Sequence, residues 1–220
     1  MVHEYTHGMT MRLVDPFVKD CFSQGEGTGL DEGWSEFMSF AMRVKKGDTR
    51  ETSYAGASSY VDPDNLGGSF TIDWQKNKLT LESLNNLWEA HDQGHVWSTA
   101  LFEVMWYLVD KYGIDNTLKP EFRADDVNNV PKDGRFLTMR LVIEGMKRIK
   151  CFTSILRARD AILEADEQLN RGENRCLIYK AFASRGLGYD AKHPHMTSGP
   201  DGPFKNGFKM PGDCRNHPDT

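Results

Sequence analysis

His3-Glu4-Tyr5-Thr6-His7, close to the amino end, is the stretch of sequence that decides how this chain folds and what chemistry it carries. Two histidines four positions apart lie one turn apart on the same face of an α-helix, with a glutamate beside them. The HExxH pattern is half of a catalytic zinc site, in which both imidazoles bind the metal and the glutamate acts as a general base. The motif alone leaves open a surface helix whose histidines have this spacing by chance.

A third metal ligand is offered by the segment that runs from Gly29 to Phe37, Gly-Leu-Asp-Glu-Gly-Trp-Ser-Glu-Phe. Its apolar residues recur at helical spacing, which predicts a glycine-rich loop over residues 25–29 and then a helix that ends at Gly47. Glu32, near the start of that helix, is the candidate third ligand. Glu36, one turn later, is placed to accept the free N–H of a zinc-bound histidine. The alternative is that these acids only favour a helix N-terminus.

Together, HEYTHG at residues 3–8 and EGWSE at residues 32–36 resemble the fungalysin family of secreted zinc metallopeptidases, which are relatives of thermolysin. The likeness covers most of the chain and is thinnest between about residues 48 and 86. The other segments that resemble the family are residues 94–97 with Leu101, Glu103 and Trp106, and the helical stretches 141–147, 158–163 and 181–188.

The resemblance implies a complete site. It makes His3, His7 and Glu32 the ligands of one zinc ion and Glu4 the general base. His91 corresponds to a family histidine that is a candidate donor to the developing oxyanion, although a histidine before a helix also serves as a cap or a core residue. Protein or peptide substrates are then implied as partners.

Two departures from the family pattern lie near this site. Glu36 stands where the family usually has aspartate, and its extra methylene moves the carboxylate away from its usual place. His95 replaces a glutamate, and we interpret it as a solvated side chain. Neither change removes a ligand or the base.

The fold class that the resemblance implies is mainly α: the helical C-terminal lobe of a thermolysin-like zincin, with irregular loops and little β structure. We expect residues 1–188 to form this lobe and residues 189–220, which are rich in glycine and proline, to form an arm or tail. The family is extracellular and is made as a zymogen. Its N-terminal β-rich lobe and propeptide are therefore expected upstream and are missing here. We expect no signal peptide within these residues, because Met1 leads directly into the zinc motif.

Composition excludes two other classes of function. The chain has 220 residues and a net charge of −5, with Lys and Arg scattered along it, which argues against nucleic acid as a partner. No apolar run is long enough to span a membrane.

Calcium is possible near Asp125-Asp126, but no EF-hand spacing supports it. His193, His195 and His217 could form a metal tract, but solvated loop histidines are the better interpretation.

Periodicity predicts a mostly helical chain. Helices are expected over residues 1–14, 95–112, 135–150, 153–169 and 174–185, and the alternating segment 70–74 suits a short strand. The long helix should bury Leu101, Met105, Leu108 and Val109. The four cysteines allow three pairings; Cys176 could instead be apolar packing, and Cys214 could fasten the tail to the body.

Two functional hypotheses follow. The chain is a zinc metalloendopeptidase, or the zinc-bearing lobe of one, that hydrolyses peptide bonds. Alternatively, it is a truncated, catalytically inactive zinc-binding lobe or a pseudoenzyme remnant that acts as a binding fragment. The second hypothesis draws on the position of His3 in the first turn of its helix, where fraying is greatest.

Overall fold

The structure, a computed structural model, is mainly α-helical, which confirms the predicted fold class. It describes residues 1–18, 20–23, 25–55, 69–124, 127–194, 203–215 and 217. The α-helices are α1 (Val2–Leu13), α2 (Glu26–Ala41), α3 (Ala90–Tyr112), α4 (Gly134–Met146), α5 (Ile155–Asn170) and α6 (Arg175–Ser184). The described residues also form two short 3-10 helices, η2 (Leu81–Asn86) and η4 (Gly212–Cys214), and two strands, β1 (Tyr54–Ala55) and β2 (Ser69–Phe70). The strands pair antiparallel, with Tyr54 opposite Phe70.

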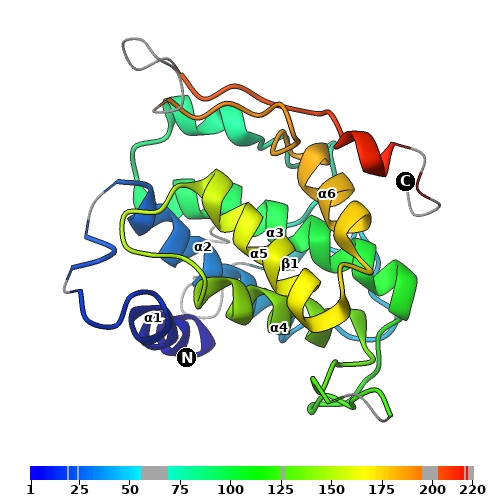
Figure 1. Ribbon diagram of the computed structural model, residues 1–220. Helices are drawn as coiled ribbons and strands as arrows, with labels where there is room; N and C mark the ends of the chain where they lie inside the picture. The colour runs from blue at the N-terminus through cyan, green and yellow to red at the C-terminus, as the bar shows by residue number, and fades with distance from the viewer. Residues whose placement is uncertain are drawn as a thin grey trace.

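Helix α3 is the centre of the core. It packs against α2, α4 and α6, and α5 covers α4 and α6 (Figure 1). All four residues that the periodicity placed on its core face are buried, as predicted. The buried surface extends around most of the helix, because neighbours lie on several sides of it. Aromatic rings join the layers: Trp97 packs edge-on against Trp34 and stacks on Phe182.

Glycines let α2 and α3 approach closely. A Cβ atom on Gly33 would lie 2.6 Å from the Gly94 carbonyl oxygen, and one on Gly94 would lie 2.7 Å from Glu32 Cβ. No larger residue fits at either position without moving the helices apart. This contact holds Glu32 against the first turns of α3 and so fixes the part of α2 that carries the candidate ligand.

Three boundaries of these two helices differ from prediction. Helix α2 begins at Glu26, so the segment 25–29 is not a loop; Gly29 lies inside the helix because Gln93 packs directly over it. The same helix ends at Ala41 rather than at Gly47. Helix α3 begins at Ala90, five residues before the predicted start, because the Glu89 side chain accepts hydrogen bonds from the N–H groups of His91 and Asp92.

A buried ion pair links α3 to the end of α6. Arg185 is 1% exposed, and its Nε donates to Glu103 Oε1 at 2.9 Å while another nitrogen donates to the Asn77 carbonyl at 2.8 Å. Burial raises the pKa of Glu103 above its ordinary value, although the charge of Arg185 works in the opposite direction. Arg50 reaches the other Glu103 oxygen at 3.3 Å. The pair therefore ties the loop at residues 72–79 to the helical core.

The disulfides resolve the pairing that the sequence left open. Cys21, between α1 and α2, is bonded to Cys151, between α4 and α5. Cys176 of α6 is bonded to Cys214, so Cys214 does fasten the carboxyl-terminal segment to the body. Residues 189–194 and 203–215 form an arm along η2 and α6, drawn orange to red in Figure 1. Within the described residues, no helix is both long and apolar enough to cross a membrane.

Candidate metal centre

Helix α1 carries the histidine pair on the face that it turns toward α2. Thr6 and Thr10 are buried on this face, and Asp15-Pro16 follows the end of the helix at Leu13. His3 and His7 are half-buried, because they lie between the two helices at the edge of the core.

Three ligand-type atoms converge at this edge. His3 Nε2 lies 3.1 Å from His7 Nε2 and 3.1 Å from Glu32 Oε2, and His7 Nε2 lies 3.7 Å from the same oxygen. A tetrahedral zinc ion with bonds of about 2.0–2.1 Å separates its ligands by about 3.3 Å. The three separations bracket that value, and two imidazoles with one carboxylate are a donor set that zinc prefers. These residues therefore fit a zinc ion.

Asp31 holds His7 in place, and sequence reasoning did not find this role. Its Oδ2 lies 2.7 Å from His7 Nδ1, while Thr10 donates to its other oxygen. Ser35 Oγ lies 3.2 Å from the same ring nitrogen. Burial raises the pKa of Asp31, although the hydrogen bonds from Thr10 and His7 oppose the shift. In the sequence, Asp31 could have been recognised as a second acidic residue directly before the candidate ligand Glu32.

Glu36 does not make the hydrogen bond that the sequence predicted. Among the described residues it forms no hydrogen bond or ion pair with His3 or His7. Its carboxylate instead lies 3.0 Å from His95 Nδ1 and accepts from Ser98. Glu36 and His95, the two departures from the family pattern, thus contact each other. Glu36 lies about one turn after Glu32 on α2, and His95 lies about one turn after His91 on α3.

His95 is accordingly not a solvated side chain, and that interpretation was wrong. Its ring packs edge-on against Phe70, with the centroids 5.2 Å apart. Burial lowers the pKa of His95, but the hydrogen bond and charge of Glu36 outweigh this effect and place the pKa above its ordinary value.

His91 and Glu4 lie at the open side of the three ligand-type atoms. His91 Nε2 is 3.3 Å from Glu32 Oε2, and its Nδ1 is 2.7 Å from Glu89 Oε1. The hydrogen bond with Glu89 and the charges around it raise the pKa of His91. The Glu4 side chain is exposed and, with His7, Asp31 and Glu32, lines an open cavity of about 740 Å³. Both Glu4 and His91 are therefore accessible from solvent.

Of the other histidines that the sequence suggested for metal binding, the described ones, His193 and His217, are not part of this cluster. His193 is 5% exposed and contacts Glu26, so the interpretation of it as a solvated histidine was wrong. His217 is exposed. His195 and Asp125-Asp126 lie outside the described residues, and calcium there stays a prediction.

Comparison with known proteins identifies the family. The sequence profile of the fungalysin metallopeptidases (M36) matches residues 1–191, which is most of the chain. The chain belongs to the fungalysin family. It is 44% identical over 191 residues to the extracellular metalloproteinase mep of Aspergillus terreus, covering 86% of this chain and 30% of that protein. It is 38% identical over 220 residues to extracellular metalloproteinase 2 of Trichophyton rubrum, covering 97% of this chain and 33% of that protein.

This fungalysin chain thus spans about a third of the length of the curated relatives that it matches. Membership in a metallopeptidase family implies a metal cofactor.

Proposed function

We propose that the chain is a zinc-dependent metalloendopeptidase, or the zinc-bearing part of one, that hydrolyses peptide bonds in proteins. The observation that carries the proposal is the convergence of His3 Nε2, His7 Nε2 and Glu32 Oε2 at separations that suit one zinc ion. Membership in the fungalysin family supports it.

The residues divide the chemistry between them. Zinc, when held by His3, His7 and Glu32, lowers the pKa of a bound water toward about 7 and polarises a peptide carbonyl. Glu4 follows His3 directly and is free of the ligand set, so its carboxylate accepts the proton of the attacking water and passes it to the leaving amine. His91, with Nδ1 held by Glu89, presents Nε2 as a hydrogen-bond donor to the oxyanion that develops during attack.

The exposure of Glu4 and His91 suggests a further part of the full-length enzyme. Both side chains lie open to solvent, whereas a catalytic cleft excludes water. We propose that an N-terminal lobe, which the family resemblance places upstream, covers this side, and that a propeptide blocks it before activation. The division into a lobe at 1–188 and an arm at 189–220 is part of the same proposal. The two disulfides and the extracellular relatives favour secretion.

The purified chain tests the assignment directly. We expect about one zinc per chain by elemental analysis, and hydrolysis of casein that a zinc chelator stops and added zinc restores. Zinc without hydrolysis would support the alternative, an inactive zinc-binding lobe. A chain that neither binds zinc nor hydrolyses casein under any condition would overturn the proposal and support the pseudoenzyme remnant.

Replacing Asp31 with alanine should weaken zinc binding by about 10–100-fold, because His7 loses the carboxylate that orients its ring. The measurement is zinc affinity by competition with a chromogenic chelator. The matched control is Glu36→Gln, one turn or so along the same helix, which contacts neither ligand histidine and should change the affinity much less. Equal losses for the two variants would show that Asp31 has no special role.

A further inference from the structure

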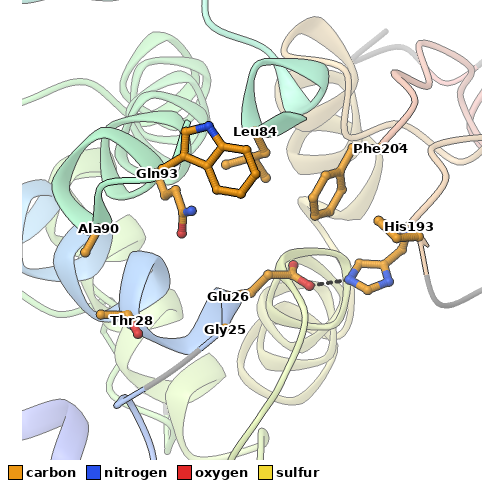
Figure 2. Close-up of a pocket in the computed structure, with 10 residues that line it drawn as sticks. Gly25, Glu26, Thr28, Leu84, Ala90, Gln93, His193 and Phe204 are labelled. Atoms are coloured by element: carbon orange, nitrogen blue, oxygen red, sulfur yellow. Dashed lines mark hydrogen bonds and ion pairs between the residues drawn. The ribbon is translucent and has the colours of Figure 1, made fainter. Parts of the chain in front are cut away.

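A second cavity lies at the beginning of the α2–α3 contact. Its volume is about 440 Å³, and it is enclosed by the first turn of α2, the segment from η2 into α3, and the carboxyl-terminal arm (Figure 2). Segments that are far apart in the sequence therefore supply its walls. Nothing in the proposed chemistry uses this space.

Hydrogen bonds between these segments hold the walls in place. Glu26 accepts from the Ile155 N–H at 2.9 Å with one oxygen and contacts His193 of the arm with the other. The Phe204 N–H donates to Asn85 Oδ1 at 2.8 Å, and Asn85 Nδ2 donates to the Phe204 carbonyl at 3.0 Å. The cavity is thus built into the fold and does not have to form around a ligand.

The surface that remains available in the cavity is mainly apolar. Gln93 Nε2 donates to the Leu87 carbonyl at 3.0 Å, so this amide, like Glu26, is engaged in the wall. Leu84 and Phe204 face the open space in Figure 2, and Trp88, which also lines it, is 90% exposed. The cavity offers more apolar than polar surface, and the exposed tryptophan beside it suits contact with an apolar group.

The cavity borders the one at the candidate metal centre. Thr28 lines both this cavity and the larger one that contains Glu4, His7 and Glu32. Thr28 precedes Glu32 by about one helical turn, which is about 6 Å along α2 at 1.5 Å per residue. An extended peptide advances about 3.3 Å per residue, so two or three residues bridge that distance.

We propose that this second cavity binds an aromatic or large aliphatic side chain of an extended peptide substrate, two or three residues from the bond that is cleaved. The inference rests on the proposed function, because it takes the metal centre as the place of cleavage. The second cavity would make the enzyme select substrates that have an apolar residue two or three positions from the cleaved bond. Trp88 and Phe204 are the residues that set this selectivity.

Peptides anchored on the metal test the distance. Acetylated tetraglycine hydroxamates, each with phenylalanine at one of the four positions, are titrated into the zinc-loaded chain by calorimetry. A second series carries the hydroxamate on a malonyl group at the amino end, so that both chain directions are sampled. In one series, phenylalanine at the second or third residue from the hydroxamate should bind about tenfold more tightly than glycine there.

Variants show where the phenyl ring lies. Trp88→Ala and Phe204→Ala should each remove most of the tenfold preference for phenylalanine over glycine. Leu118→Ala is the control, because Leu118 is 83% exposed on the α3–α4 connection, outside the cavity. This variant should keep the preference for phenylalanine. The inference is overturned if no position shows the preference, or if the preference survives both cavity variants. If acetohydroxamate itself does not bind the zinc-treated chain, the proposed function fails first and this inference falls with it.

Discussion

Changing Glu4 to glutamine is expected to lower casein hydrolysis by about 10²–10⁴-fold while the chain keeps about one zinc. Glutamine has nearly the same shape as glutamate, but its amide does not accept a proton from the attacking water at neutral pH. The side chain is exposed in the cavity and is not one of the three converging ligands, so neither metal binding nor folding should change. The measurement is the rate constant for casein hydrolysis alongside the zinc content of the same preparation.

Glu121→Gln is the matched control, because it makes the same chemical change at an exposed glutamate whose partner is the exposed Lys132. It should leave both rate and zinc content as they are in the wild type. A Glu4→Gln variant that loses zinc would make Glu4 a ligand, and one that keeps more than about a tenth of the activity would assign the base to another residue.

Changing Arg185 to methionine should lower the free energy of unfolding by about 3–5 kcal/mol, since it leaves the Glu103 carboxylate buried without its main partner. The raised pKa of Glu103 reflects the same unfavourable burial. Arg50 reaches Glu103 from the surface and offsets part of the loss. The measurement is urea unfolding of the zinc-loaded chain with both disulfides intact.

Two comparisons separate this effect from the general loss of a cation. In the double variant, Arg185→Met with Glu103→Leu, no charge is buried, and a large part of the stability should return. Arg157→Met breaks an ion pair with Glu164 whose side chains are both well exposed, and should cost less than about 1 kcal/mol. If the Arg185 and Arg157 variants unfold at the same urea concentration, the buried pair contributes nothing beyond a surface pair.

Local patterns were sufficient for most of the helices and insufficient for their ends. The apolar residues of α3 follow a 3.6-residue period, and those predicted to face the core are buried. Its start was missed because the cap that the Glu89 side chain forms with the N–H groups of His91 and Asp92 was not recognised in the sequence. The start of α2 was missed for a different reason: glycine signals a loop unless, as at Gly29, a neighbouring helix packs directly over the position.

In the candidate site as well, spacing predicted the positions of residues on one helix but not their partners on another helix. His3, Glu4 and His7 share one helix, so their spacing alone fixes their relative positions, and the structure brings Glu32 to them. Glu36 was given the supporting role by its spacing from Glu32, but Asp31 holds His7 instead. Spacing gives the face of a helix, whereas the partner that the face meets depends on the rotation of the neighbouring helix.

By itself, the sequence determined the family through the resemblance of its motifs. It also determined the helical class through short-range periodicity, and the chemical types at the candidate metal centre through the residues present. Only the tertiary structure decided the cysteine pairing, the partners of Glu36 and His95, and the cavity between the arm and α2. Each of these depends on how residues tens of positions apart pack together. The contact between α2 and α3 is an example, because it forms only where glycines let the two helices approach closely.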